Sequence, residues 1–336
     1  MICVYGAGSI GCYVGGRLAA AGADVVFVGR ERLAAELREH GLTATDLHGH
    51  RGRVERPRYT TDPAAAADAD LVLLTVKSGA TAQAATELAL HLRPDTLVLS
   101  LQNGLRNPEI LRQHLPEATV LAGMIACNVV HFGEGRFHAG TDGGLQVQDH
   151  PRLPVADFDR AGLPLDRHRD LTAAQTAKLL LNLNNAVNAL SGLPLRAELS
   201  QRAYRRCLAL AVREALAAFG AAGLAVGKVA GLPARLLPAV LGLPDAVYVR
   251  AARRTLSMDE WARSSTWDDL EAGRATEVDH FNGEIGALAA EHGLTAPANA
   301  RLAALVHAAE DGGRRDWTGP ELLAELRTAC AEDRRG

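Results

Sequence analysis

Short apolar runs alternate with stretches of helical periodicity in the first half of the chain. Four of the runs predict buried strands, at residues 2–5, 24–28, 71–76 and 96–101. Helical patterns follow these strands, ending near residue 21 after the first and covering residues 33–39, 80–92 and 107–114 after the others. This alternation favours a parallel sheet with helices on both faces.

Further strands are expected before the midpoint of the chain, separated by glycine-rich turns. Residues 120–130, 136–139 and 145–147 have strand-like patterns, and they could form an antiparallel edge of the sheet. The alanine-rich residues 62–69 are expected to form a helix or a turn.

The pattern changes near residue 170, and the rest of the chain is almost entirely helical in periodicity. Six helices are predicted, at residues 173–190, 202–222, 235–255, 278–291, 300–310 and 319–329, before a frayed tail at residues 332–336. We place a domain boundary within residues 165–171. The chain of 336 residues therefore divides into an α/β domain, residues 1–169, and an all-α domain, residues 170–336.

The composition excludes several classes of protein. A net charge of −3 provides no basic field for nucleic acid or for an anionic membrane. The long Ala/Leu-rich stretch at residues 207–232 is interrupted by charges, so no membrane span is expected. The five cysteines are dispersed without a CxxC pair, which predicts reduced thiols and no metal site. The chain opens without the pattern of a secretory signal, and we expect a cytoplasmic protein.

The first predicted strand leads into the motif Gly6-Ala7-Gly8-Ser9-Ile10-Gly11, which fits the GxGxxG pattern of dinucleotide-binding folds. The pattern alone is weak, but here it lies between a strand and a helix. Gly6 permits the tight turn, Gly8 lets the backbone approach a pyrophosphate, and Gly11 lets the helix pack close to the strand. The motif therefore predicts a Rossmann-type nucleotide-binding domain, with a ligand-free glycine turn as the alternative.

The end of the second strand indicates which dinucleotide is bound. An NAD-binding fold usually has an acidic residue there, about 20 residues beyond the glycines, for the ribose hydroxyls. This chain has Arg30 at that point, and an arginine fork suits a 2′-phosphate. NADPH/NADP+ is therefore the expected cofactor, although the preference weakens if Glu31 faces the ribose instead.

Two later strands also end in polar residues, Lys77 after the third and Asn103 after the fourth. Ligands of open α/β sheets lie outside the carboxyl ends of the strands, so both residues are candidate contacts of the cofactor or the substrate. A helix-capping Lys77 and a turn-forming Asn103 are the alternatives. Only three of the 36 basic residues are lysines, Lys77, Lys178 and Lys228, which indicates either that a compact or removable charge is needed there or a chance of composition.

Polar residues interrupt the first helix of the second domain. Lys178, Asn182 and Asn185 are spaced i, i+4, i+7, so they share one helix face, while Leu179, Leu180 and Leu183 point into the core. Asparagine is a poor helix former, and a lysine with a row of amides is costly on a largely apolar helix unless something polar binds there. The pattern favours a binding site over a plain solvated face.

A second polar segment covers residues 262–283. Thr276 could cap a helix that begins near Glu277, which would place this carboxylate in the first turn. From the residues alone, a loop and a capped helix with a solvated acid is the favoured interpretation, and a catalytic acid is the alternative.

Together these blocks resemble the ketopantoate reductase (2-dehydropantoate 2-reductase) family, in order and over nearly the whole chain. The resemblance rests on the Gly6–Gly11 motif and on four further blocks: Thr75-Val76-Lys77, Gln102-Asn103-Gly104, Lys178-Leu179-Leu180-Leu181-Asn182, and Ser264-Ser265 with Asp269 and Arg274-Ala275-Thr276-Glu277-Val278-Asp279. The last block is the most specific.

The resemblance implies NADPH-dependent reduction of ketopantoate to pantoate, a step toward pantothenate and coenzyme A. It implies that Lys178 is the general acid and that Glu277 orients the substrate hydroxyl or the catalytic amine. It also implies that Asn103 and Asn182 bind the substrate, that Ser265 holds its carboxylate, and that Lys77, Asn103 and Glu277 lie on the cofactor side. The chemistry agrees, because hydride transfer to a 2-oxo acid develops negative charge that a positioned ammonium can stabilise and protonate.

The chain departs from the family pattern in places that bear on the substrate. The family usually has a second substrate asparagine eight residues after the catalytic lysine, where this chain has Ala186. Asn185 and Asn188 are the candidates to replace it, and Asn185 lies on the better helix face. The family often has methionine after the serine pair, where this chain has Thr266.

Three functions are therefore weighed. The favoured one is a ketopantoate reductase, and the second is a reductase of another branched 2-oxo acid on the same scaffold. The third, a non-catalytic NADP(H)-sensing protein, would have no need of Lys178, Asn182 and Glu277 together. The expected partner is a small 2-oxo acid. The Ala/Leu-rich helices could form the surface of a homodimer, and burial inside the helical domain is the equally favoured alternative.

Overall fold

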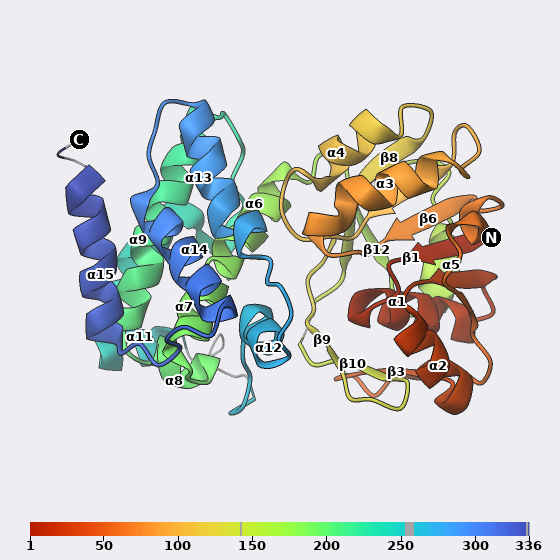
Figure 1. The fold of residues 1–336 in the computed structure, drawn as a ribbon, viewed down its shortest axis with the longest axis horizontal. Coiled ribbons are helices and arrows are strands. Elements are labelled where there is room, and N and C mark those ends of the chain that lie inside the picture. The colour runs from red at the N-terminus through yellow and green to blue at the C-terminus, as the bar shows by residue number, and fades with distance from the viewer. Residues whose placement is uncertain (142, 253–258, 334, 336) are drawn as a thin grey trace. The chain divides into compact units, whose positions relative to one another are not determined.

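The computed structural model describes residues 1–141, 143–252, 259–333 and 335 (Figure 1). The contacts divide the chain into two compact units, Met1–Leu171 and Thr172–Gly336. The first contains the two larger sheets and the second is mainly helical, which confirms the α/β and all-α character expected from the sequence.

An eight-stranded sheet forms the centre of the first unit, in the order β12-β11-β8-β7-β6-β1-β2-β5. Six neighbouring strands of this sheet are all parallel, in the order β8, β7, β6, β1, β2 and β5. In this order β1 lies between β2 and β6. This is the strand order of dinucleotide-binding folds, in which ligands bind where the order reverses. The strands are β1 (Ile2–Tyr5), β2 (Val25–Val28), β5 (Arg58–Thr60), β6 (Leu71–Leu74), β7 (Leu97–Ser100), β8 (Thr119–Ile125), β11 (Leu145–Gln148) and β12 (Leu165–His168).

The two faces of this sheet bury separate cores. Successive side chains of a strand point to opposite faces, so Ile2 and Val4 of β1 join one core while Cys3 and Tyr5 join the other. The helices that cover the sheet are α1 (Ser9–Ala20), α3 (Thr81–Ala89), α4 (Asn107–His114) and α5 (Val155–Arg160). α1 and α5 contribute to the first core and α3 and α4 to the second, so the sheet is covered on both faces as predicted (Figure 1).

The expected antiparallel edge is only partly correct. β11 does pair antiparallel with β8, whereas residues 129–139 belong to a different sheet. That second sheet has the order β4-β3-β10-β9, and it packs against α1. Its strands are β3 (Leu42–Asp46), β4 (Arg51–Val54), β9 (Val129–His131) and β10 (Arg136–Ala139), and α2 (Glu31–His40) precedes it. Residues 62–69 contain the short 3-10 helix η1 (Pro63–Ala66).

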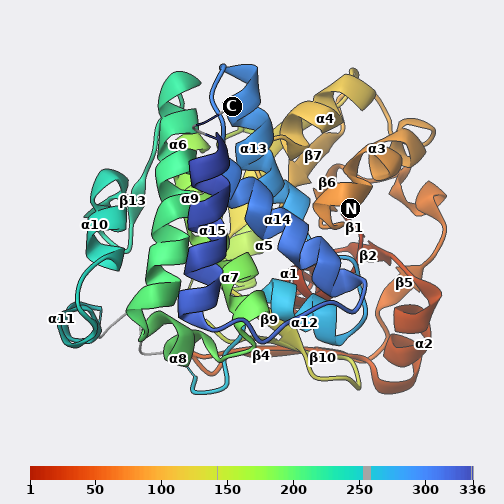
Figure 2. The same ribbon diagram turned by 60° about the vertical axis from the view of Figure 1, so that its left-hand side comes forward.

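A 20-residue helix, α9 (Arg202–Ala221), is the central element of the second unit. It packs against α10 (Leu237–Leu241), α13 (Asn282–Glu291), α14 (Pro297–Glu310) and α15 (Gly319–Asp333). Figure 2 shows α9 and α15 side by side. The remaining helices are α6 (Thr172–Asn182), α7 (Asn184–Ser191), α8 (Leu195–Leu199), α11 (Asp245–Ala251) and α12 (Ser265–Glu271), with a small hairpin of β13 (Lys228–Val229) and β14 (Leu232–Pro233).

Three predicted helices of this unit are shorter than expected. The helix predicted at residues 173–190 divides into α6 and α7 at Leu183, although the backbone there stays right-handed. The one predicted at residues 235–255 is interrupted between α10 and α11, where Pro244 cannot continue a helix, and residues 253–255 lie outside the described part. α13 begins at Asn282 instead of residue 278. Of the predicted frayed tail, residues 332 and 333 belong to α15, and residues 334 and 336 are outside the described part.

Candidate active site

The glycine turn after β1 has the geometry that a bound dinucleotide requires. Gly6 has a φ of +86°, and a Cβ at this position would lie 2.5 Å from the backbone nitrogen of Val76. A Cβ at Gly11 would lie 2.5 Å from Thr75 Oγ1, so both positions exclude a side chain. At Gly8 a Cβ would project into open space, meeting only Gly6 O at 3.8 Å. The turn is therefore tight on the protein side and open where a pyrophosphate would approach.

α1 begins immediately after this turn. Its first turn carries no acidic residue, and no side chain caps it. Among the described residues, the backbone amides of Ser9, Ile10 and Gly11 find no acceptor, because the first helical hydrogen bond runs from Cys12 N to Gly8 O at 2.8 Å. Free amides and the positive end of the helix dipole suit a phosphate. Ala7 is buried beneath the turn.

Arg30 follows β2 and Gly29, and it is the residue before α2. Its side chain is exposed, and within the described ranges its guanidinium has no hydrogen-bond or ion-pair partner. Glu31 lies in the first turn of α2, where its carboxylate approaches Arg38 at 3.6 Å. The cationic group, and not Glu31, is therefore the one left available for a ligand at this strand end.

The loops after β6 and β7 are joined by partly buried hydrogen bonds. Ser78 Oγ donates to Asn103 O at 3.0 Å, and Gln102 Nε2 donates to Val76 O at 3.0 Å. Lys77 is exposed and Asn103 partly exposed at the surface of these loops. Because the parallel pairing of β6 and β7 brings their carboxyl ends together, the loops hold Lys77 and Asn103 at the same edge of the sheet.

In the second unit, Lys178, Asn182 and Asn185 are partly exposed, while Leu179 and Leu180 are buried. The interruption at Leu183 therefore leaves the predicted face recognisable. Leu183 N still donates to Leu179 O at 3.0 Å, so the hydrogen-bonding pattern of α6 extends to Leu183.

Asn188 is not available for a ligand. It is fully buried, its Nδ2 donates to Leu193 O at 2.9 Å, and its Oδ1 accepts the Ser264 amide at 2.9 Å. Ser264 Oγ donates to Asn185 O at 3.1 Å and accepts the Trp267 amide, which caps α12. Asn188 and Ser264 thus fasten the start of α12 to α7.

This attachment brings two of the predicted site residues together. Asn185 Nδ2 donates to Ser265 Oγ at 3.3 Å, and both side chains reach the surface. Asp269 and Arg274, which belong to the same sequence block, form an ion pair at 3.0 Å that holds the segment after α12. Of the two asparagines that the sequence left open, Asn185 is the one whose side chain remains exposed to a ligand.

The inner side of α7 holds a buried acid. Asn184 Nδ2 donates to Glu198 Oε2 at 2.9 Å, and Glu198 has no exposed surface. Burial raises the pKa of Glu198 to about 8, against the opposing effects of Asn184, Asn188 and Arg205. The buried Arg205 is bound by the carbonyl oxygens of Leu199, Leu241 and Leu243 and by Asp245. Glu198 is therefore largely uncharged at neutral pH.

Glu277 lies in a different element from the one predicted. It precedes the 3-10 helix η4 (Val278–His280), and α13 begins only at Asn282. Thr276 Oγ1 accepts the Val278 amide at 3.3 Å, so it stabilises this short turn and does not cap an α-helix. Glu277 is partly exposed, as a ligand contact requires.

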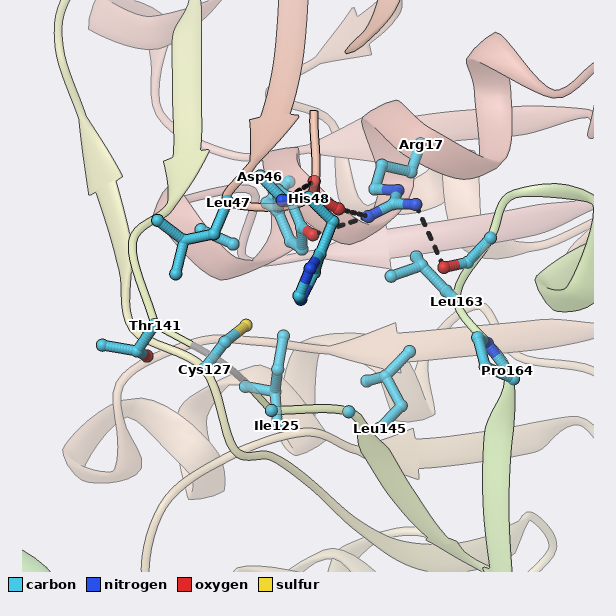
Figure 3. A pocket seen from close by; sticks show the side chains of 15 residues that line it. Arg17, Asp46, Leu47, His48, Ile125, Cys127, Thr141, Leu145, Leu163 and Pro164 are labelled. Atoms are coloured by element: carbon cyan, nitrogen blue, oxygen red, sulfur yellow. Dashed lines mark hydrogen bonds and ion pairs between the residues drawn. The ribbon is translucent and has the colours of Figure 1, made fainter. Parts of the chain in front are cut away.

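A separate pocket of about 140 Å³ lies in the first unit (Figure 3). It is lined by residues including Arg17, Asp46, His48, Cys127 and Leu145, none of which the sequence placed at the site. Arg17 is only 4% exposed, and it is bound by Asp46 at 2.6 Å and by the carbonyl oxygens of residues 161 and 162. The charge of Arg17 is therefore paired within the fold, and this guanidinium is not available to a ligand in the pocket.

Within the described part of the chain, no group of histidine, cysteine and acidic side chains could hold a metal ion. In the same part, no helix is both long and apolar enough to cross a membrane.

Comparisons with known proteins identify the family. The model for "Ketopantoate reductase PanE/ApbA" matches residues 2–152, and the model for its C-terminal domain matches residues 170–310. The chain belongs to the ketopantoate reductase family. The 2-dehydropantoate 2-reductase of Halobacterium salinarum is 32% identical over 321 residues, covering 93% of this chain and 99% of that protein.

Solved structures agree with this assignment. The PanE/ApbA family ketopantoate reductase from Ralstonia eutropha is 31% identical, with a TM-score of 0.79 over 93% of this chain and 99% of that chain. A D-mandelate dehydrogenase in complex with NADH and anilino(oxo)acetate has a TM-score of 0.77 over 93% of this chain and 99% of that chain. Its identity is 19%, so this second likeness concerns the fold alone.

The structural roles of three residues at the site are not predicted from the sequence. Asn188 is a candidate substrate ligand there and Ser264 belongs to the block that resembles the family, whereas Glu198 is not singled out. One available signal was Ser264 itself, because a serine before a helix with Asp268 in its first turn is a common N-cap pattern. For Glu198 no signal existed, because a single acid on a short helix is normally exposed.

Proposed function

We propose that the protein reduces ketopantoate to pantoate with NADPH, as its family membership implies. The observation that carries the proposal is the second-unit arrangement, in which Lys178, Asn182 and Asn185 are all partly exposed and Ser265 is bound to Asn185. A sensing protein would need the glycine turn and Arg30 but not these polar side chains.

NADPH fits the first unit because the Gly8 position is open and the amides of Ser9, Ile10 and Gly11 find no acceptor among the described residues. When bound, the cofactor supplies the hydride that reduces C2 of the substrate. Arg30 would bind the 2′-phosphate, since a guanidinium forms paired hydrogen bonds with phosphate oxygens. Lys77 and Asn103 would contact the cofactor from the neighbouring strand ends, and Ala7 would form the floor of the turn.

Lys178 is the proposed general acid. As hydride adds to C2, the carbonyl oxygen gains negative charge, and the ammonium of Lys178 would stabilise that charge and transfer one proton to the oxygen. The product is then the 2-hydroxy acid, and the lysine is left neutral until it regains a proton from water. Arginine could not perform this step because its proton does not leave at neutral pH.

The other polar side chains would hold the substrate. Ser265 and Asn185 are proposed to bind the carboxylate, and Asn182, one helical turn after Lys178, to bind the carbonyl or hydroxyl oxygen. Asn103 is proposed to contact the substrate from the first unit. Glu277 would accept a hydrogen bond from the substrate hydroxyl or from the Lys178 amine, and contact the cofactor, because a carboxylate is an acceptor of such bonds.

One departure from the family pattern favours a second candidate, a reductase of another branched 2-oxo acid. Ala186 replaces the usual second asparagine, and it is buried, so it offers no polar contact. Asn185 is the proposed substitute, and its position one residue earlier would shift the substrate-binding amide.

The proposal is tested by following NADPH oxidation with ketopantoate and with a panel of branched and aromatic 2-oxo acids. We expect ketopantoate to have the highest kcat/KM, and NADH to be a poorer donor than NADPH. Higher kcat/KM with another 2-oxo acid would favour the second candidate, and no turnover with any of them would refute both. A cytoplasmic location and a homodimer remain part of the proposal, and light scattering would test the dimer.

A further inference from the structure

The segment that carries Glu277 is fastened to α14 on both of its sides. Before Glu277, the Thr276 amide donates to Glu310 Oε1 at 2.7 Å. After Glu277, Asp279 Oδ1 lies 2.9 Å from His307 Nε2. The two attachments are joined, because His307 Nδ1 lies 2.9 Å from Glu310 Oε2. One imidazole ring therefore connects the anchors on either side of Glu277.

The geometry of this ring requires a proton on each nitrogen. An ionised carboxylate can only accept hydrogen bonds, and each nitrogen of His307 faces one. A neutral imidazole would have one N–H and would turn a lone pair toward the other carboxylate. The contacts thus select the imidazolium, a cation between two anions.

The charges around His307 favour the same state. Hydrogen bonds from Glu310 and Asp279 raise the pKa of His307. Burial acts to raise the pKa of Glu310, but the Thr276 amide and His307 lower it overall. Other helices packed against α14 also carry acidic residues. Glu214 of α9 accepts hydrogen bonds from the Ala298 and Asn299 amides at the start of α14, and Glu325 of α15 pairs with Arg301. α13 carries Glu284 and Glu291. The electrostatic effects on His307 come from Asp279 and Glu310.

We propose that His307 is a positioning residue, whose protonated ring holds Asp279 and Glu310 together and so fixes the orientation of Glu277. The inference rests on the proposed role of Glu277 in binding. When His307 loses its proton as the pH rises, one of its two contacts is lost and the anchor on that side loosens. Glu277 then loses its fixed direction, so productive substrate binding weakens at alkaline pH.

The first test compares the pH profiles of kcat/KM for ketopantoate in the wild-type protein and in two variants. His307→Gln is uncharged at every pH and cannot replace the cation between the two carboxylates, so kcat/KM should fall roughly 3- to 10-fold at neutral pH, the effect of about one hydrogen bond. His307→Lys carries a charge that persists to higher pH and can donate to both carboxylates. It should therefore extend activity toward alkaline pH. His292→Gln, an exposed position at the end of α13, is the control and should follow the wild type.

The second test needs no turnover. The ring signals of His307 in the proton NMR spectrum of the wild-type protein should titrate above the ordinary histidine pKa of about 6.5, and Asp279→Asn should lower that pKa. A wild-type pH profile in the His307→Gln variant, or titration of His307 at or below its ordinary pKa, would overturn the inference. If instead Glu277→Gln leaves kcat/KM unchanged while the pKa of His307 is raised, the proposed role of Glu277 in binding fails. The contacts of His307 with Asp279 and Glu310 would then have a structural role alone.

Discussion

Replacing Glu198 with glutamine tests how the inner side of α7 is stabilised. Glu198 is fully buried, and its Oε1 and the Oδ1 of Asn184 are both buried without a hydrogen-bond partner while the acid is ionised. A proton on Glu198 supplies the missing donor, since a carboxylic acid and an amide that share one N–H···O bond can close a ring with an O–H···O bond. Glutamine has the same shape and carries N–H groups at every pH.

The sign and size of the effect follow from proton linkage. Burial raises the pKa of Glu198 from 4.5 to about 8 in the folded protein. Below pH 4.5 the group is protonated in both states, so folding bears no penalty. Between pH 4.5 and about 8 the unfolded chain releases this proton and the folded protein retains it. The free energy of unfolding therefore falls by about 1.4 kcal/mol per pH unit, to a total loss of about 5 kcal/mol.

The assay is urea unfolding of the wild type and the Glu198→Gln variant from about pH 5 to about pH 9, followed by circular dichroism. The stability of the variant relative to the wild type should rise up to about pH 8 and then level off, because glutamine does not ionise. Glu332→Gln, at the exposed end of α15, should stay within about 0.5 kcal/mol of the wild type. A relative stability that does not change with pH would show that Glu198 is ionised inside the fold, and would refute the reasoning.

Three further predictions concern the site. Lys178→Ala should lower kcat roughly 10²- to 10⁴-fold because the general acid is lost. The control variant Lys228→Ala, at an exposed position of β13, should match the wild type. Equal kcat in the two variants would exclude Lys178 from proton transfer. Arg30→Ala should weaken NADPH binding by about 1.5–3 kcal/mol and leave NADH binding nearly unchanged, which fluorescence titration with both cofactors measures; an equal loss for both would place Arg30 away from the 2′-phosphate. Asn188→Ala should lower the free energy of unfolding by about 1–3 kcal/mol, because the Ser264 amide loses its buried acceptor. Asn185→Ala should instead raise the KM for ketopantoate with little loss of stability. The reverse outcome would exchange the roles assigned to the two asparagines.

The parts of the fold that follow from local pattern were predictable from the sequence. The strands β1, β2, β6 and β7 and the long helices α9, α14 and α15 follow clear patterns of apolar residues. The structure has each of them within a few residues of its predicted bounds. The second sheet was missed because β3 and β4 contain few apolar residues, and because β3 pairs with a strand about 90 residues later. Such a pairing is decided by tertiary packing against α1 and not by local preference.

The candidate site shows the same limit. Spacing alone put Lys178, Asn182 and Asn185 on one face, and the structure leaves all three partly exposed. Spacing could not tell that Asn184 and Asn188, one residue before and three after Asn185, are held by Glu198 and Ser264. These partners come from other segments, so the distinction between a ligand asparagine and a structural one becomes visible only in the folded chain.

Hydride transfer from NADPH to ketopantoate is the central claim, and an isotope measurement tests it most directly. The protein would be incubated with ketopantoate and NADPH deuterated at the transferring carbon, and the product analysed by mass spectrometry, with Lys178→Ala in parallel. We predict pantoate with a single deuterium at C2 from the wild type and far less from the variant. Unchanged ketopantoate in the presence of bound NADPH, or pantoate without deuterium, would contradict the account.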